Sequence, residues 1–266
     1  MLTTGPATCA SSGPAIPRTE PTGYDVFGLH LPEVERVARW SRFAFERYFR
    51  VDASGHEHVP LVGPAILVSN HSGMLPVDAT MLWLDVFRRT GRVVRTIADR
   101  FVPRLPFVST LFSRVGVVSG SRPNVRWLLE HGELVAIFPE GTTGPGKSMA
   151  QHYHLQDWRV GHVEFAIRHR VPIIPIAIIG AEESWPLLAR IPHVHLFGAP
   201  YLPLPVSLVP LPVRFHIHYG APIRFDDPPA SADDPEVLAR AAAITRGAVE
   251  RLIAHGLIAR DQGRGQ

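Results

Sequence analysis

His71 and Asp78, separated by six residues, are side chains that could act together as a base and the acid that orients it. Ester formation from a thioester needs a base to take the proton of the acceptor hydroxyl, an acid that holds this base, and donors for the oxyanion. His71 comes just after the apolar run 65–69, and Asp78 opens a helical pattern, 78–89. By itself the pair is weak evidence, because a polar turn residue and a helix-capping acid would give the same pattern.

A second polar block follows another apolar run, 134–138, and consists of Pro139, Glu140, Gly141 and Thr142. It combines an acid, a flexible glycine and a hydroxyl in one turn. Backbone N–H groups in such turns can bind a phosphate or an oxyanion. The carboxyl ends of neighbouring strands are where open α/β sheets usually place their sites, so we expect this block to meet His71 there.

Short apolar strands alternate with helical segments along most of the chain. The pattern predicts strands at 65–69, 93–98, 115–118, 134–138, 172–179 and 214–219, and helices at 78–89, 124–131, 160–169 and 233–255, with a loop and short helix at 103–112. This alternation is typical of an α/β fold. We therefore predict a single domain over residues 55–256, with a mixed, mostly parallel sheet of about six or seven strands flanked by helices.

The segments outside this domain have other compositions. Residues 1–20 and 257–266 are expected to be flexible tails, and residues 21–54 to form an amphipathic helix centred on 32–50. Its arginine-rich face beside an aromatic one fits a helix at a membrane surface and equally a helix packed on the core. The proline-laced apolar segment 198–212 is expected to be a loop that either wraps the core or faces lipid.

Composition limits the kinds of partner. The pI of about 9.4 comes from arginine, since Lys147 is the only lysine, and no Lys/Arg-rich run predicts nucleic acid. Cys9 is the only cysteine, which excludes an intramolecular disulfide and a multi-cysteine metal site. No apolar run reaches the roughly 18 residues of a spanning helix, and the N-terminus lacks the pattern of a signal peptide. A lipid-active protein of this kind would lie on a membrane rather than cross it.

Four blocks in this order resemble the glycerolipid (lysophospholipid) acyltransferase family. They are Asn70-His71 with Asp78, Gly116 to Arg122, Phe138 to Thr142, and Val171 to Pro175, and the resemblance covers roughly residues 55–225. It is strongest with the branch related to mono- and diacylglycerol acyltransferases, through the segments 144–147, 153–155 and 180–183. The chain departs from the family in one respect, because six residues instead of four separate the histidine from the aspartate. We expect the contact to survive, since Pro76 fixes the angle at which the chain enters the helix.

The resemblance implies a glycerol-phosphate acyltransferase-like fold and an enzyme with His71 as general base and Asp78 as its partner, working without an acyl-enzyme. It implies a substrate site formed by Asn70, Ser72, Arg122, Phe138, Pro139, Glu140, Gly141 and Thr142, with Lys147 near a phosphate of lipid or coenzyme A. The acyl donor would be acyl-CoA or acyl carrier protein, and the acceptor a lysophospholipid or an acylglycerol. No metal or cofactor is implied. The expected place is the cytoplasmic face of a membrane, and the oligomeric state is undetermined.

Two other readings stay open. Residues 141–148 match the P-loop pattern Gly-x4-Gly-Lys-Ser, although Pro145 removes one N–H from the loop and no helix is signalled after Ser148. A lipid-binding module without catalysis would keep the aromatic helix but would not need His71. Four His-x-His pairs lack a third ligand at a convincing spacing, and no Gly-x-Ser-x-Gly elbow of a serine hydrolase occurs.

Overall fold

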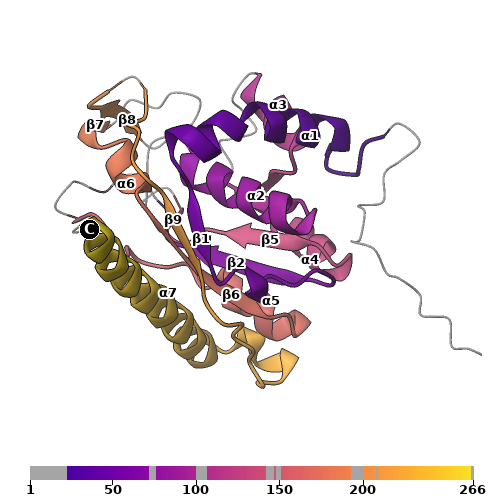
Figure 1. The fold of residues 1–266 in the computed structure, drawn as a ribbon. Coiled ribbons are helices and arrows are strands. Elements are labelled where there is room, and N and C mark those ends of the chain that lie inside the picture. Colours follow the sequence, from indigo (N-terminus) through magenta and orange to yellow (C-terminus); the bar gives the residue numbers. More distant parts are fainter. Residues whose placement is uncertain are drawn as a thin grey trace, which may run out of the picture.

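The protein is described by a computed structural model that covers residues 23–71, 76–99, 107–141, 147, 151–192, 201–207 and 209–264 (Figure 1). The predicted tail 1–20 and the predicted site residues Ser72 and Thr142 lie outside these ranges.

Seven strands form the main sheet in the order β1-β9-β6-β2-β5-β3-β4. Their bounds are β1 (Asp52–Ser54), β2 (Ala65–Ser69), β3 (Val94–Ala98), β4 (Val118–Ser119), β5 (Leu134–Ile137), β6 (Ile173–Ile179) and β9 (His216–Tyr219). The five strands from β6 to β4 are mutually parallel, whereas β9 runs antiparallel to β6 and pairs in parallel with β1. The predicted mixed, mostly parallel sheet is confirmed.

Helices cover both faces of this sheet (Figure 1). One face carries α1 (Leu31–Trp40), the π-helical turn η1 (Ala44–Tyr48), α2 (Val77–Thr90) and α3 (Val108–Arg114); the other carries α4 (Arg122–Glu130), α5 (Gly161–His169) and the long α7 (Pro235–Arg264). Successive side chains of β2 enter the two layers in turn, with Ala65 and Leu67 in the first core and Ile66 and Val68 in the second. Burial on both sides explains why the run is continuously apolar.

The shortest elements complete the chain. The 3-10 turns η2 (His56–His58) and η6 (Pro229–Asp233) lie in connections, and α6 (Ala181–Ser184) directly follows β6. A separate antiparallel pair consists of β7 (Leu187–Pro192) and β8 (Tyr201–Pro205). Among the described residues, no helix is both long and apolar enough to cross a bilayer.

Several predicted boundaries were wrong. The helix expected over 32–50 is divided, because α1 ends at Trp40 and the π-helical turn η1 begins at Ala44. The strand expected at 115–118 shrinks to Val118–Ser119. The proline-laced loop contains β8, which prolines permit because a two-stranded sheet consists only of edge strands. The closing helix continues to Arg264, through residues expected to be a tail.

Candidate active site

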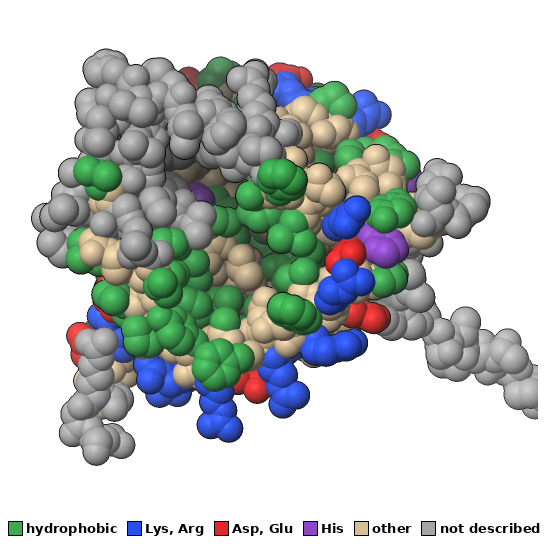
Figure 2. Space-filling model, turned by 90° about the horizontal axis from the view of Figure 1, so that it is seen from above, with side chains coloured by type: hydrophobic (Ala, Val, Ile, Leu, Met, Phe, Trp, Pro, Cys, Tyr) green, Lys and Arg blue, Asp and Glu red, His purple; other side chains and the backbone are tan. Residues whose placement is uncertain are grey.

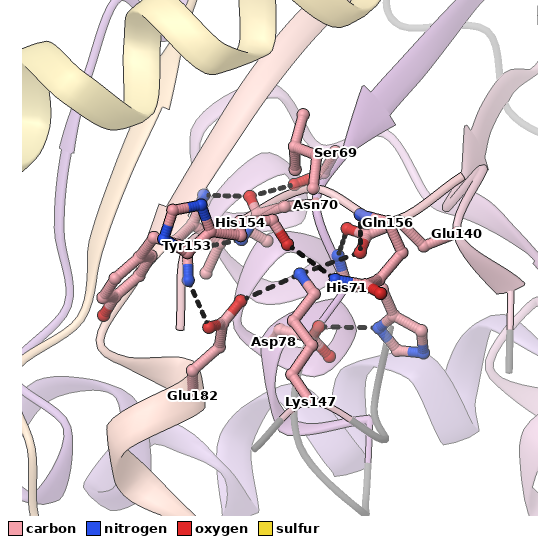
Figure 3. A network of polar contacts seen from close by, with 12 residues as sticks. Ser69, Asn70, His71, Asp78, Glu140, Lys147, Tyr153, His154, Gln156 and Glu182 are labelled. Carbon is pink, nitrogen blue, oxygen red and sulfur yellow. Dashed lines mark hydrogen bonds and ion pairs between the residues drawn. The ribbon is translucent and has the colours of Figure 1, made fainter. Parts of the chain in front are cut away.

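His71 and Asp78 meet at the carboxyl end of β2, despite the six residues between them (Figure 3). The imidazole Nδ1 lies 2.7 Å from Asp78 Oδ2. His71 leaves β2 two residues after its end, and Asp78 is in the first turn of α2 rather than at its N-cap, which is Pro76. The Asp78 side chain is fully buried, while that of His71 is 18% exposed. Solvent and substrate can therefore reach the imidazole but not its acid.

The surroundings of His71 act on its pKa in opposite directions. Burial lowers the pKa of the imidazole, but the charge and hydrogen bond of Asp78 and the charge of Glu140 together raise it above the usual value. Because Asp78 is an acceptor, Nδ1 carries the hydrogen in this contact. The second ring nitrogen, Nε2, then has a free lone pair in the neutral form, which is the form that acts as a base.

Asn70 joins β2 to β6, because its side-chain amide continues the hydrogen bonding between the two strands beyond Ser69. Its Nδ2 donates to the carbonyl of Ile178 at 2.9 Å, and its Oδ1 accepts from the N–H of Ile178 at 2.8 Å. The residue is fully buried. Asn70 was expected to bind substrate, but its amide is engaged within the protein and fixes the backbone immediately before His71.

Glu140 holds the backbone of His71 from the neighbouring strand, β5. Its Oε1 accepts the N–H of His71 at 3.1 Å, and its Oε2 accepts the N–H of Gln156 at 3.1 Å. Oε2 also lies 2.8 Å from the ammonium of Lys147. The sequence predicted that the blocks around His71 and Glu140 would meet, and in the structure they do. The buried carboxylate, however, supports His71 rather than pointing toward solvent.

Lys147 was expected near a substrate phosphate, and here the structure differs. Its ammonium lies between Glu140 and Glu182, 3.1 Å from Glu182 Oε1, and only 2% of its side chain is exposed. The other oxygen of Glu182 accepts the N–H of Tyr153 at 2.6 Å. Figure 3 shows the side chains of Glu140, Lys147 and Glu182 close to one another and to His71. Sequence reasoning assigned no role to Glu182, although an acid directly after an apolar strand is a signal of the same kind as Glu140.

The remaining predicted residues lie around this centre in different ways. The Phe138 ring packs against the imidazole of His71, with 4.7 Å between the ring centroids. The Gly141 N–H donates to the carbonyl of Phe138 at 3.0 Å, so it is used within the turn, and Pro139 accepts from the N–H of Arg159 at 3.1 Å. Arg122 instead pairs with Glu164 of α5 at 2.8 Å.

One cation near the turn was not anticipated. A Cβ on Gly141 would come within 3.2 Å of the Arg159 guanidinium, and that side chain is 71% exposed. Arg159 also lies 3.7 Å from Asp99, which follows β3. No local sequence pattern distinguishes this arginine from the many others. It places an exposed positive charge beside the turn that was expected to bind the acceptor.

The position of Lys147 argues against a nucleotide-binding P-loop. A P-loop lysine must reach the phosphates of a nucleotide, and a helix must begin directly after the motif. Lys147 is buried against two carboxylates, and the next helix longer than one turn among the described residues, α5, begins only at Gly161. In the described part of the chain, no group of three or more potential metal-ligating side chains occurs.

Comparisons with known proteins point to a single family. Residues 50–179 match the family model described as Acyltransferase. An uncharacterized protein of Mycobacterium tuberculosis is 40% identical over 209 residues, covering 74% of this chain and 58% of that protein. The human protein named "DGAT1/2-independent enzyme synthesizing storage lipids" is 29% identical over 207 residues, covering 76% of this chain and 60% of that protein. The chain thus spans less than two thirds of these curated relatives.

A solved structure shares the fold. The 1-acyl-sn-glycerophosphate (LPA) acyltransferase, PlsC, from Thermotoga maritima superimposes with a TM-score of 0.54 over 82% of this chain and 79% of that one. The two sequences are 17% identical, so this likeness concerns the fold alone. The predicted glycerol-phosphate acyltransferase-like architecture is confirmed.

Proposed function

We propose that this chain, whose residues 50–179 match the Acyltransferase family model, transfers a fatty acyl group to a hydroxyl of a glycerolipid. The donor in this proposal is acyl-CoA or acyl carrier protein, and the acceptor is a lysophospholipid or an acylglycerol. The observation that carries the proposal is the contact of 2.7 Å between His71 Nδ1 and Asp78 Oδ2 at the end of β2. A lipid-binding module would not need a partly exposed histidine held by a buried acid.

In the proposed reaction His71 acts first as base and then as acid. Nε2 takes the proton of the acceptor hydroxyl while the hydroxyl oxygen attacks the thioester carbonyl, and Asp78 stabilises the imidazolium that forms. The tetrahedral intermediate then collapses, its C–S bond breaks, and the leaving thiolate receives the proton from His71. The acyl group passes directly to the acceptor, so no residue of the protein is acylated.

The acceptor class can be tested through Arg159. An acceptor with a phosphate would meet the exposed guanidinium beside Gly141, whereas a neutral acylglycerol would not need it. The human relative is named for storage lipids, and the Thermotoga maritima structure for a phosphate-bearing acceptor. Arg159→Gln should therefore raise KM for lysophosphatidate and leave KM for mono- or diacylglycerol unchanged.

The activity assay offers labelled acyl-CoA or acyl carrier protein to the purified protein, with lysophosphatidate, monoacylglycerol or diacylglycerol as acceptor. His71→Ala should abolish transfer, because the base is lost, and His131→Ala is the matched control. His131 caps α4 and stacks on Trp127. Absence of transfer by the wild-type protein to all three acceptors would refute the proposal. Full activity of His71→Ala would refute the proposed mechanism.

The proposal includes attachment to the cytoplasmic face of a membrane through the surface that carries α1 and α3. The exposed apolar side chains there include Trp40 and Phe43, which are 82% and 68% exposed, and Phe107, which is 91% exposed. Figure 2, which looks onto this side, shows hydrophobic side chains gathered around a hollow with Lys and Arg along an edge. Aromatic side chains bordered by arginine suit the interface of an anionic bilayer.

The loop after β8 adjoins this surface. Tyr48 of η1 donates through its hydroxyl to the carbonyl of Pro210 at 2.6 Å, and Arg50 donates to Pro212 at 2.8 Å. In this loop Val206 and Val209 are 55% and 63% exposed. The aromatic helix and the apolar loop were each expected either to meet lipid or to pack on the core. The contact between them supports one shared lipid-facing surface.

Vesicle flotation tests this attachment. The double variant Trp40→Ala/Phe43→Ala should lose binding to vesicles of phosphatidylcholine with an anionic lipid, and wild-type binding should weaken with added salt. Ile258→Ala is the matched control, because Ile258 is 59% exposed on α7, on the opposite side of the sheet. Equal flotation of the double variant and the control would exclude the aromatic side chains as the anchor.

A further inference from the structure

The only lysine of the chain is enclosed in a charge network that none of the proposed chemical steps uses. Lys147 lies 2.8 Å from Glu140 and 3.1 Å from Glu182, and all three side chains are at most 2% exposed. Removing an ammonium and two carboxylates from water is unfavourable unless each finds a partner. Here the partners are one another and the N–H groups of His71, Gln156 and Tyr153.

The network links the three loops that follow β2, β5 and β6. Glu140 stands three residues beyond the end of β5 and reaches the His71 backbone, while Glu182 lies in α6, directly after β6. Lys147 is the positive charge between them, so its position couples α6 to the loop of His71. The segments around Lys147, Tyr153 and Glu182 are those of the closest resemblance to the acylglycerol branch. The structure brings them together in one cluster.

Lys147 supplies the one positive charge among the three buried side chains of the cluster. Two buried carboxylates share one ammonium, and burial raises the pKa of Glu182 despite the opposing effect of Lys147. Without the ammonium, the buried carboxylate of Glu140 would lose the cation that lies 2.8 Å from its Oε2. Glu140 would then shift toward water, and its bond to the His71 N–H would weaken.

We propose that Lys147 is a positioning residue for the acyl transfer, holding His71 in place through Glu140 with Glu182 as its second anchor. The inference rests on the proposed function, because it assigns Lys147 a role in that reaction. It removes Lys147 from the residues expected to bind a phosphate. It predicts that Lys147 affects the rate of the bound complex more than the affinity for either substrate.

The main test compares Lys147→Met with wild type for kcat, KM and the pH dependence of kcat. We expect kcat to fall by about ten- to a hundred-fold, because small displacements of a catalytic group have effects of this size. KM for donor and acceptor should change by less than about three-fold, in keeping with a role outside binding. Lys147 lowers the pKa of His71, whereas Asp78 and Glu140 raise it. Its loss should therefore move the acidic limb of the pH profile to higher pH.

A conservative variant and a control separate positioning from stability. Lys147→Arg keeps the charge and should recover part of the lost kcat. Arg95→Met removes another buried ion pair, the 2.6 Å contact with Asp25, near the start of β3 and away from the strand ends that carry the site. It should lower the free energy of unfolding but leave kcat and the pH midpoint of the folded protein unchanged.

The outcomes distinguish this inference from the proposed function. If wild type transfers no acyl group, the proposed function fails. If wild type is active and folded Lys147→Met has the same kcat and pH midpoint, the inference is wrong. Should Lys147→Met not fold, Glu182→Gln decides, because it removes the charge of the second anchor and leaves one acceptor oxygen where Lys147 and Tyr153 now use two. A kcat lowered several-fold with unchanged KM supports the inference, and unchanged kcat overturns it.

Discussion

The carboxylate of Asp78 controls both the orientation and the proton affinity of His71. Its charge and hydrogen bond raise the pKa of the imidazole against the effect of burial. Only neutral His71 can accept a proton, so activity should rise with pH through this raised pKa. Asp78→Asn removes the charge but leaves the burial, so the midpoint should move to lower pH while kcat falls by about a hundred-fold or more. The pH dependence of kcat measures both effects.

Asp85→Asn is the matched control for this prediction. Asp85 is buried in the same helix, where it binds Arg89 Nε at 2.8 Å and the hydroxyl of Tyr219 at 2.8 Å. Its replacement should cost stability without moving the pH midpoint. If the two variants shift the midpoint equally, Asp78 has no special effect on His71.

At the residue scale, sequence patterns predicted which blocks meet but not what each side chain does there. His71, Asp78 and Glu140 are brought together at the ends of β2 and β5 as expected. The role of Lys147 could not be anticipated, because its partner Glu182 is 35 residues away in the sequence and no local pattern reports burial. The sequence around Lys147 even matches the pattern of a phosphate-binding motif.

Among the elements, the end of β2 depends on the Asn70 amide for its attachment to β6. Asn70→Ala would leave the N–H and the carbonyl of Ile178 without their partner in a buried position. Each of the two unsatisfied groups costs about 1–3 kcal/mol, so the free energy of unfolding should fall by about 2–6 kcal/mol. Urea denaturation measures this loss. Since His71 is the next residue, kcat should fall as well.

Asn124→Ala provides the comparison. Asn124 donates through Nδ2 to the carbonyl of Ser119 at 3.0 Å in a partly buried position, so its loss should cost about 1 kcal/mol. It should leave kcat unchanged. Equal losses of stability in the two variants would mean that the Asn70 contacts with β6 are not a special attachment.

The long apolar elements were predictable, and the short or polar ones were not. β2 and β6 were predicted as strands because burial on both faces makes their sequences continuously apolar. α2 and α5 were predicted as helices because their helical spacing of apolar residues continues over more than two turns. β1 has only three residues and is held by its pairing with β9, a partner more than 160 residues later. No local signal encodes such pairing. The π-helical turn that begins at Ala44 depends likewise on tertiary packing, since Phe45 and Phe49 are buried there.

For the whole molecule, the buried His162 makes stability depend on pH. Burial is the main cause that lowers its pKa to about 4, opposed by the hydrogen bond with the Arg159 carbonyl. In the unfolded chain the pKa returns to about 6.5, so the unfolded state binds more protons between these values. Stability is full above about pH 6.5 and is lost as the pH falls toward 4. The loss between about pH 7 and pH 5 should be about 2 kcal/mol.

Urea unfolding of His162→Phe tests this contribution. The variant should be less stable near neutral pH, because the hydrogen bond to Arg159 is lost, but its stability should fall less steeply with acidification. His131→Phe, which replaces an exposed histidine, should keep the slope of wild type. A His162→Phe slope equal to that of wild type would assign the acid sensitivity to other groups.

The burial of the only lysine also has a practical consequence for labelling. All other basic side chains with long stems are arginines, so Lys147 carries the only side-chain primary amine of the protein. Amine-reactive reagents should leave Lys147 of the folded protein intact, because its side chain is buried between two carboxylates. Any reaction at Lys147 would then report the opening of the cluster that it forms with Glu140 and Glu182, without an introduced probe.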